Sequence, residues 1–335
     1  MNATLQSLSS IRELTQYFLE KYIENKDKKM SIQYYTVIRN LWDIKNHCKS
    51  YSPFSFIKVL GELNPILAEI TANDSKDLII FMLEQLHEEL NLVGDNNFDT
   101  NLIRNENQFD ESKTITEFVH HFEKRYNSII SNLFYGITET NSQCCVYKKI
   151  KYDFKSFSWL EFNLKKINDF CFKNNLRKDY KGQGNPDIDL YECFYHYQNA
   201  ITLKDNNQKY CDNCGKLTDL LNVKYFFSLP YYLIIILERG KDEQYKCNVK
   251  IPNILNLNNY LKYRTINSIF QLKAVISNIR PSSILKKYLA YCRHYKDNNW
   301  YKYNDSFVTK CHSKKEYLNG LPRILFYESL DKELN

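Results

Sequence analysis

The stretch "SLPYYLIIILERG" (228–240) decides how the C-terminal half folds, because it contains most of the most apolar stretch of the chain, "YFFSLPYYLIIIL" (225–237). A β-rich run, "VKYFF" (223–227), precedes it, and Pro230 separates the two because proline removes a hydrogen-bond donor from a sheet. The uninterrupted apolar residues 231–237 predict a central strand that is buried on both faces. The whole apolar stretch is too short to span a bilayer, and Ser228 and Pro230 interrupt it.

More strand-like stretches follow towards the C-terminus. Aromatic and β-branched residues predict strands over 268–279, 286–295, 299–304, 306–311 and 323–328. Asn304, Asp305 and Ser306 are turn-forming residues between two of these stretches. We therefore expect an antiparallel sheet in the second half of the chain.

The first part of the chain has helical periodicity instead. Apolar residues recur at helical spacing from the opening "MNATLQSLSS" (1–10) onwards: Leu5, Leu8, Ile11, Leu14 and Phe18. Asn2 and Thr4 are residue types that cap helix N-termini. A second strong helix is predicted to start at Asp74, and another covers 115–134. Helices followed by an antiparallel sheet predict an α+β fold.

The composition is that of an intracellular globular protein. The chain has 335 residues, with 46 lysines and arginines against 39 acidic residues, and its net charge is +7. The basic residues are scattered, so we expect a solvated surface and no nucleic-acid interface. Arg12 and Glu13 interrupt the apolar stripe of the first helix, so we expect no signal peptide there. We predict a cytoplasmic or nuclear monomer without membrane contact, whose ten cysteines are reduced thiols or metal ligands.

The sharpest local motif is "YCDNCGK" (210–216). Cys211 and Cys214, followed by Gly215, suit a tight knuckle that directs two thiolates at one Zn²⁺. Cys144 is the upstream partner candidate, but the position three residues after it is Tyr147. A structural zinc site almost always has four ligands. The sequence therefore predicts an incomplete zinc site, and a redox motif or chance spacing remains the alternative.

Several segments of the chain, taken in order, resemble the segments of one known family. "MNATLQSL" (1–8) is similar to the end of that family's cysteine box, and "ANDSKDLIIFMLEQLHEELN" (72–91) resembles its Gln-Gln-Asp-Ala-x-Glu-Phe segment and helix. "LFYGITETNSQCC" (133–145) with "YCDNC" (210–214) resembles its zinc-finger region. Its later segments are resembled by "SLPYYLIIILERG", "LKKYLAYCR" (285–293), "WYKYNDSFV" (300–308) and "RILFYES" (323–329). The resemblance extends over nearly the whole chain in the right order, and the family it points to is the ubiquitin-specific proteases, which are papain-like cysteine peptidases.

The resemblance implies one papain-like hydrolase domain over 1–330 with a tail at 331–335. A helical thumb would cover about 1–133, β-rich fingers about 134–228, and an antiparallel palm about 229–330. Such a protein binds ubiquitin or ubiquitinated proteins. It cleaves the bond after the C-terminal glycine of ubiquitin with a thiol, a histidine base and an orienting acid, and it needs no cofactor for catalysis.

Matched position by position, the family's catalytic set is incomplete in this sequence. The nucleophilic cysteine would fall two residues before Met1. The base histidine corresponds to Lys287, and the orienting acid corresponds to Asp305. A lysine base must be neutral, and lowering its pKa from about 10.4 to near 7 requires roughly 4–5 kcal/mol. Because Asp305 would stabilise the ammonium form, we expect an ion pair between Lys287 and Asp305 and no base. His294, on the same predicted strand, is expected to be a surface histidine.

Two carboxylates are candidates for ubiquitin binding. Asp74 and Asp77 match acidic positions of the family that would contact the basic tail of ubiquitin. The alternative for Asp74 is a purely structural role as the cap of its helix. The family's Lys-Arg-Phe is Glu238-Arg239-Gly240 in this chain, which is a further departure.

Three hypotheses about function follow. The first is a family member that keeps the fold and ubiquitin binding but does not hydrolyse, a pseudoenzyme. The second is an active deubiquitinase with a longer N-terminus and an unusual base. The third is a scaffold that binds another protein through the same surface. Lys287 lies inside the chain, so it favours the first hypothesis whatever precedes Met1.

Overall fold

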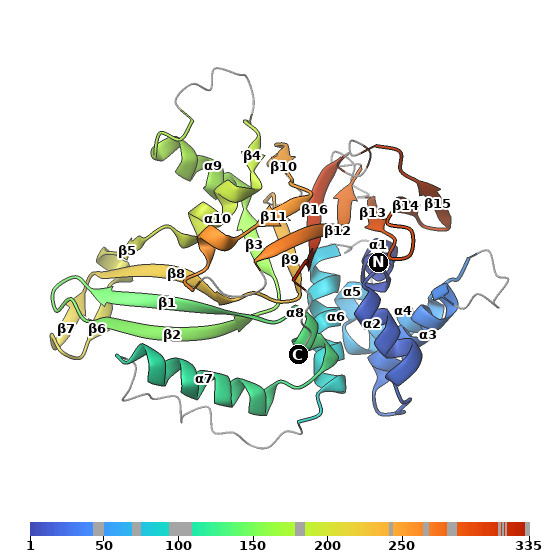
Figure 1. The fold of residues 1–335 in the computed structure, drawn as a ribbon, viewed down its shortest axis with the longest axis horizontal. Helices are drawn as coiled ribbons and strands as arrows, with labels where there is room; N and C mark the ends of the chain where they lie inside the picture. Colours follow the sequence, from blue (N-terminus) through green and yellow to red (C-terminus); the bar gives the residue numbers. More distant parts are fainter. Residues whose placement is uncertain are drawn as a thin grey trace.

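The computed structural model describes residues 1–42, 50–68, 75–93, 109–177, 185–240, 244–263, 268–279, 287–313, 316, 318 and 320–331. Helices of the first part gather on one side of a large sheet, and a second, narrower sheet extends away from it (Figure 1). The predicted α+β fold is confirmed. Among the described residues, no helix has both the length and the apolar character needed to cross a membrane.

The first part of the described chain is helical as predicted. Its elements are α1 (Asn2–Ser9), α2 (Arg12–Gln16), the π-helix η1 (Tyr17–Lys21), α3 (Lys29–Trp42), α4 (Phe54–Leu63), α5 (Pro65–Ala68), α6 (Ser75–Leu90), α7 (Glu111–Arg125) and α8 (Ile129–Phe134). All five residues of the opening apolar stripe are buried, although the helix breaks between Ser9 and Arg12. The apolar residues therefore predict correctly which side of the segment is buried. The predicted single helix is α1, followed after the break by α2 and directly by η1.

Helix capping agrees with expectation in some places and not in others. Asp110 caps α7 through Lys113 N–H, and Ser128 with Ser131 forms a capping box on α8. In α1 the cap position is Met1, and it makes no side-chain capping bond. The prediction that Asn2 and Thr4 cap this helix is therefore wrong. Both residues lie inside α1, and the Asn2 side chain is used for a contact with the large sheet instead.

The large sheet has eight strands in the order β15-β14-β13-β12-β16-β9-β3, with β11 paired to β12. Its strands are β3 (Leu160–Asn163), β9 (Tyr232–Glu238), β11 (Ile254–Asn256), β12 (Ile269–Asn278), β13 (Tyr288–Arg293), β14 (Trp300–Asn304), β15 (Phe307–Lys310) and β16 (Leu321–Ser329). Strand β9 is paired on both sides and buried along its length. Its adjacent residues Ile234 and Ile235 belong to two different hydrophobic cores, one on each face of the sheet. This explains why the sequence of β9 is apolar without alternation.

One face of the large sheet packs on the first helices, and the other face packs on α9 (Leu164–Lys173) and α10 (Leu190–Gln198). Strand β3 pairs with β9 in parallel, so the sheet is mixed and not wholly antiparallel as expected. Strand β3, α9 and α10 lie within the range 134–228 that was assigned to fingers. The division into thumb, fingers and palm stays a prediction. Within the range assigned to the fingers, β3 is a strand of the large sheet, and α9 and α10 pack on that sheet.

The narrower sheet has the strand order β2-β1-β8-β5. It consists of β1 (Gly136–Cys144), β2 (Ile150–Phe157), β5 (Ile201–Leu203) and β8 (Leu220–Ser228), and the ribbon of β6 (Lys209–Cys211) and β7 (Lys216–Thr218) lies at its far end (Figure 1). We call this far end the fingertip: residues 144–149 and 209–218. A two-stranded pair of β4 (Ile188–Asp189) and β10 (Val249–Lys250) lies next to α10.

A buried ion cluster joins α7 to the narrower sheet. Lys262 Nζ pairs with the carboxylate of Glu139 on β1 and, at 2.8 Å, with Glu111 Oε1 at the start of α7. The side chain of Glu139 is fully buried, and that of Lys262 is 19% exposed. Burial raises the pKa of Glu139, and the Lys262 ammonium opposes this shift. We call Glu111, Glu139 and Lys262 the α7 ion cluster.

Candidate active site and candidate metal centre

Helix α1 is held at both ends. At its C-terminal end the Ser9 carbonyl oxygen accepts hydrogen bonds from Thr15 Oγ1 (2.8 Å) and Trp42 Nε1 (3.2 Å). At its N-terminal end Asn2 Nδ2 donates to Asp305 Oδ1 across 2.6 Å. Leu5 and Leu8 between them are buried in the core. The first turn of α1 is thereby fixed against the β14–β15 hairpin.

Asp305 lies in the turn of that hairpin, as the sequence predicted. Asn304 pairs with Phe307, so Asp305 and Ser306 form the turn between them. Asp305 has a φ of +54°, in the left-handed region that aspartate tolerates better than most residues. Besides the bond to its carboxylate from Asn2, its carbonyl oxygen accepts from Gln6 Nε2 at 2.9 Å. The backbone and the side chain of Asp305 are therefore both tied to α1.

Lys287 directly precedes β13, and its Nζ lies 3.7 Å from Asp305 Oδ2. The expected ion pair is thus present. The two side chains are 33% and 58% exposed, so water reaches the pair. The two carboxylate oxygens of Asp305 contact different partners, one the Asn2 amide and the other the Lys287 ammonium. The carboxylate of Asp305 therefore contacts residues from both ends of the chain.

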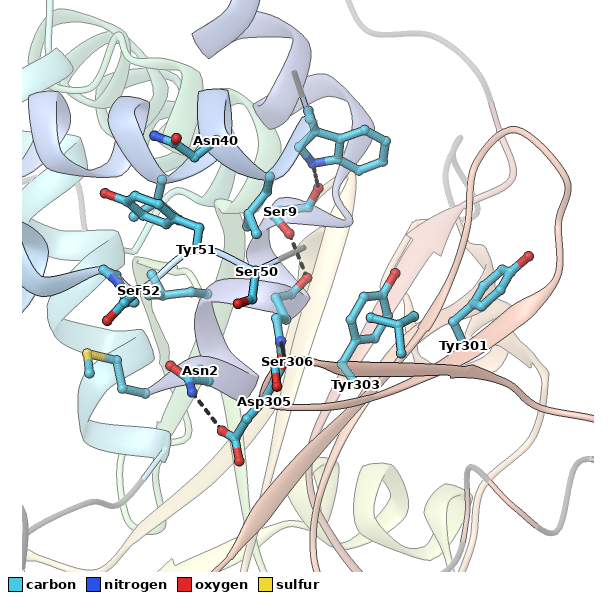
Figure 2. A pocket seen from close by; sticks show the side chains of 18 of the residues that line it. Asn2, Ser9, Asn40, Ser50, Tyr51, Ser52, Tyr301, Tyr303, Asp305 and Ser306 are labelled. Atoms are coloured by element: carbon cyan, nitrogen blue, oxygen red, sulfur yellow. Dashed lines mark hydrogen bonds between the residues drawn. The ribbon is translucent and has the colours of Figure 1, made fainter. Parts of the chain in front are cut away.

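A cavity of about 810 Å³ opens beside this pair. It lies between α1, the end of α3, the start of α4 and the β14–β15 hairpin, and Figure 2 shows Asn2 and Asp305 bonded within its lining. Tyr51, Tyr301 and Tyr303 contribute aromatic rings to the lining. The cavity brings together residues from both ends of the sequence, which no local pattern could predict.

His294 also lines this cavity. Its side chain is 27% exposed, and its ring stacks on Trp42 with the centroids 5.7 Å apart and an interplanar angle of 17°. His294 is therefore a partly exposed histidine, and the indole at the end of α3 covers one face of its imidazole. The contact joins helix and hairpin residues that are far apart in sequence, which is why sequence reasoning missed it.

A second set of charges bridges the helices and the large sheet. Lys76 Nζ on α6 lies 2.8 Å from Glu161 Oε1 on β3 and 3.4 Å from Glu238 Oε2 on β9. Arg323 Nη2 on β16 donates to the same Glu238 oxygen at 3.1 Å. Although burial opposes it, pairing with Glu161 and Glu238 raises the pKa of Lys76. Glu238, which departs from the resembled family, therefore has a structural partner on each side.

One of the two predicted ubiquitin contacts, Asp77, directly follows Lys76 of this bridge in the sequence. Asp77 is in the first turn of α6 and is exposed. Asp74 lies outside the described residues, so its alternative role as a cap is not observed. A contact of either carboxylate with ubiquitin stays a prediction.

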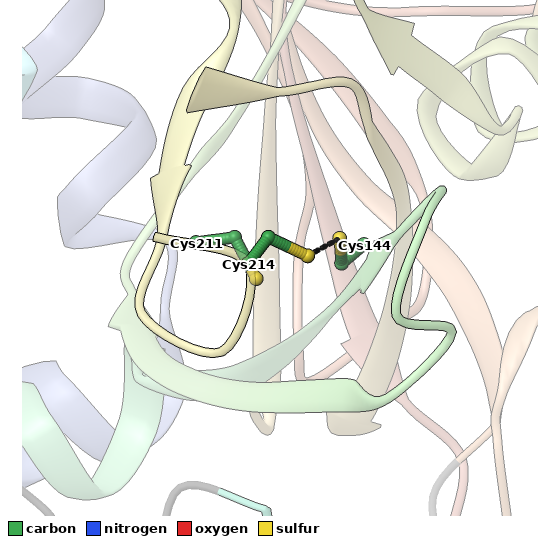
Figure 3. A group of neighbouring side chains, drawn as sticks. All are labelled: Cys144, Cys211 and Cys214. Atoms are coloured by element: carbon green, nitrogen blue, oxygen red, sulfur yellow. Dashed lines mark hydrogen bonds between the residues drawn. The ribbon is translucent and has the colours of Figure 1, made fainter. Parts of the chain in front are cut away.

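The fingertip brings three of the predicted metal ligands together. The sulfur atoms of Cys144, Cys211 and Cys214 all lie within 4.8 Å of one another (Figure 3). Gly215, with φ +65°, and the bond from Gly215 N–H to the Cys211 carbonyl (2.9 Å) form the expected knuckle. Burial raises the pKa of the Cys144 thiol, but hydrogen bonds from Thr218 and from backbone N–H groups outweigh this and lower it. Thiolates are the ligands that zinc prefers, so the three residues present fit that metal.

Comparison with known proteins places these two sites in context. The sequence model described as "Ubiquitin carboxyl-terminal hydrolase" matches residues 1–327. Human "Ubiquitin carboxyl-terminal hydrolase 2" is 22% identical over 349 residues, covering 98% of this chain and 53% of that protein. Mouse "Ubiquitin carboxyl-terminal hydrolase 21" is 22% identical over 362 residues, covering 100% of this chain and 60% of that protein. This chain therefore spans between half and three-fifths of the length of these relatives.

Solved structures give the same fold. The structure of the SAGA DUB module Ubp8/Sgf11/Sus1/Sgf73 bound to monoubiquitin matches with a TM-score of 0.70 and 19% identity, covering 100% of this chain and 67% of that chain. The same module bound to ubiquitin aldehyde matches with a TM-score of 0.70 and 20% identity. Together with the match of the family model over nearly the whole sequence, these findings confirm the resemblance that the segments suggested. The chain belongs to the ubiquitin carboxyl-terminal hydrolase family.

Proposed function

We propose that this chain binds ubiquitin and does not hydrolyse the bond that follows the C-terminal glycine of ubiquitin. The observation that carries the proposal is the contact of 3.7 Å between Lys287 Nζ and Asp305 Oδ2. At the matching place the family uses a neutral histidine, which takes the proton of the nucleophilic thiol, and an acid that orients the histidine. In this chain an ammonium group takes the place of that base.

The carboxylate beside Lys287 also speaks against a lysine base. A neutral lysine at pH 7 requires roughly 4–5 kcal/mol relative to its ordinary pKa. A carboxylate close to an ammonium stabilises the charge, and Asp305 is held in place by Asn2 and Gln6. Partial exposure of the lysine side chain also keeps the ion hydrated. All of these contacts act against a lysine base.

Ubiquitin binding is supported by the fold and by α6. Solved structures of the matching fold have monoubiquitin or ubiquitin aldehyde bound, and their match covers this whole chain. Asp77 is an exposed carboxylate at the start of α6, where the family contacts the basic tail of ubiquitin. The bridge from Lys76 to Glu161 and Glu238 holds this end of α6 against the large sheet. A charged partner would therefore meet a fixed surface.

The test of non-hydrolysis compares two extended versions of the chain. Both carry the family sequence Gly-Asn-Thr-Cys-Tyr directly before Met1, and one of them also carries Lys287→His. With a ubiquitin C-terminal fluorogenic amide, we expect turnover only in the histidine version, because a positioned base contributes about 10²–10⁴-fold. Equal and substantial turnover by the version that keeps Lys287 would refute the proposal and favour an active enzyme with an unusual base.

The test of binding is a titration of the unextended chain with ubiquitin, followed by calorimetry or NMR. We expect saturable binding that weakens at least about tenfold, or 1.4 kcal/mol, in Asp77→Lys. Glu88→Lys, near the other end of the same helix, is the matched control and leaves the affinity unchanged. No binding by a folded chain would contradict the proposal and favour a scaffold for another protein.

A further inference from the structure

The three fingertip sulfurs are already spaced for one tetrahedral ion. A Zn–S bond is about 2.3 Å long, so two sulfurs of a regular tetrahedron are about 3.8 Å apart. Cys144 Sγ and Cys214 Sγ are separated by 3.8 Å, and Cys211 Sγ lies within 4.8 Å of both. Cys144 comes from the end of β1, whereas the other two come from the β6–β7 ribbon (Figure 3). The fold therefore brings together three possible ligands from two separate segments.

The fourth corner of the tetrahedron has no strong ligand among the described residues. The group that can hold a metal consists of Cys144, Cys211 and Cys214 alone. Tyr147, three residues after Cys144, contributes its backbone N–H to Cys144 Sγ at 3.3 Å, and its side chain has no sulfur. Cys145 is excluded from the group, and its backbone N–H bonds to the Asp219 carbonyl. A hydroxyl group, Thr218 Oγ1, lies 3.4 Å from Cys144 Sγ and serves that thiol as a hydrogen-bond partner.

The knuckle is the part of this group that is open to water. Cys144 and Thr218 are buried, whereas Cys211 and Cys214 are partly exposed. Tyr147 is 50% exposed. An ion with three thiolates has a net charge of −1. Four exposed lysines are near its ligands in the sequence, Lys148, Lys149, Lys209 and Lys216, against one exposed carboxylate between two ligands, Asp212. This excess of positive charge would favour a further anionic ligand.

We propose that the fingertip binds one Zn²⁺ through three thiolates, Cys144, Cys211 and Cys214, and leaves the fourth coordination position to an external ligand. That ligand is water, and a small-molecule thiol replaces it as thiolate. Closed four-ligand sites are typical of structural zinc, whereas a site with an open position exchanges its ligand. The fingertip of this chain is thus an exchangeable site in a position where a purely structural ion would be expected.

Cobalt(II) is the probe for this proposal, because its absorption reports ligand type and number. We expect a thiolate-to-cobalt band with the intensity of three thiolates, and red ligand-field bands that shift when 2-mercaptoethanol is added. Cys144→Ser should lose about one third of the thiolate band, as expected for two ligands in place of three. Cys145→Ser is the matched control, and its spectrum should equal that of the unchanged chain.

Tyr147→Cys sharpens the test by offering a fourth thiolate from the exposed position. We expect a stronger thiolate band, tighter Zn²⁺ binding in competition with a chromogenic chelator, and no further shift with 2-mercaptoethanol. A spectrum of the unchanged chain that does not respond to the external thiol would overturn the open position. Failure of that chain to bind Co²⁺ or Zn²⁺, or a band of only two thiolates, would overturn the site itself.

Discussion

Two lysine–carboxylate contacts in this molecule involve the same types of group but differ in how far water reaches them. Beside the cavity, Lys287 and Asp305 lie 3.7 Å apart with side chains 33% and 58% exposed. In the α7 ion cluster, Lys262 is 19% exposed and its partner Glu139 is fully buried. Water can take the place of either partner in the first contact, but it cannot reach Glu139. Burial, and not the presence of an ion pair, therefore decides which lysine the fold depends on.

The difference also bears on function. A lysine that the fold does not need can be exchanged for histidine without unfolding the chain. The comparison of Lys287 with its histidine variant then reports chemistry and not misfolding. The four predictions below test the contrast between the two contacts, in order of decreasing effect.

The largest effect is expected for Lys262→Met. The substitution leaves the Glu139 carboxylate buried without its ammonium partner, which typically costs about 3–5 kcal/mol. Urea unfolding should therefore show a strongly reduced free energy of unfolding. Lys155→Met on β2 is the matched control, because Lys155 is 75% exposed and pairs with Asp153, whose side chain is 52% exposed. A loss below about 1 kcal/mol in Lys262→Met would contradict the contrast between the two contacts.

The same variant should become less destabilised at low pH. Burial raises the pKa of Glu139, and a carboxyl group with a raised pKa stabilises the fold below its unfolded value of 4.5. That contribution to stability is lost as the pH rises through the pKa that Glu139 has in the folded chain. Without Lys262 the folded value rises further, so the stability difference from the unchanged chain should shrink between pH 7 and pH 5. The slope should vanish in the double variant Glu139→Gln, Lys262→Met, and a difference that grows towards pH 5 would refute this assignment.

A smaller effect is expected for Glu111→Gln. In this variant Lys262 still pairs with Glu139, so no buried charge is left without a partner of opposite charge. We expect a loss of about 1 kcal/mol and faster amide exchange in α7, because the start of this helix loses its anchor. Glu123→Gln, at an exposed position of the same helix, should leave the exchange rates unchanged. Exchange that accelerates equally in both variants would show that Glu111 is not the anchor.

The smallest effect is expected for Lys287→Ala. The pair is exposed, and Asp305 keeps its bonds to Asn2 and Gln6. Contacts of this kind contribute about 0–1 kcal/mol, so the unfolding midpoint should hardly move. The measurement is again urea unfolding, with Lys262→Met in parallel. A loss above about 2 kcal/mol would show that the cavity region depends on this lysine for its fold.

Much of the fold followed from local patterns. The uninterrupted apolar run predicted the buried strand β9, and the helical spacing from Leu5 to Phe18 predicted a buried stripe. The turn-forming residues around Asp305 predicted the turn between two strands. The pairing of Lys287 with Asp305 also followed, because the resemblance had placed both residues at one site. In the same way, the knuckle at Cys211 and Cys214 was recognisable from the spacing of its cysteines.

What could not be predicted depends on contacts between distant segments. The α7 ion cluster joins Glu139 to Lys262, and neither residue has a distinctive local sequence. His294 stacks on Trp42 of a helix near the other end of the chain. Asn2 has the composition of a cap and yet bonds to Asp305, since tertiary contact outweighs capping preference there. Sequence periodicity describes a segment's own face and says nothing about its partner.

The left-handed backbone of Asp305 bears on why an aspartate stands at this position. At φ +54° a turn of this kind favours aspartate, asparagine or glycine, and most other side chains strain it. The backbone of the hairpin alone is therefore a sufficient reason for an aspartate at this position, whatever chemistry takes place beside it. Lys287, which lies 3.7 Å from its carboxylate, has no such backbone reason.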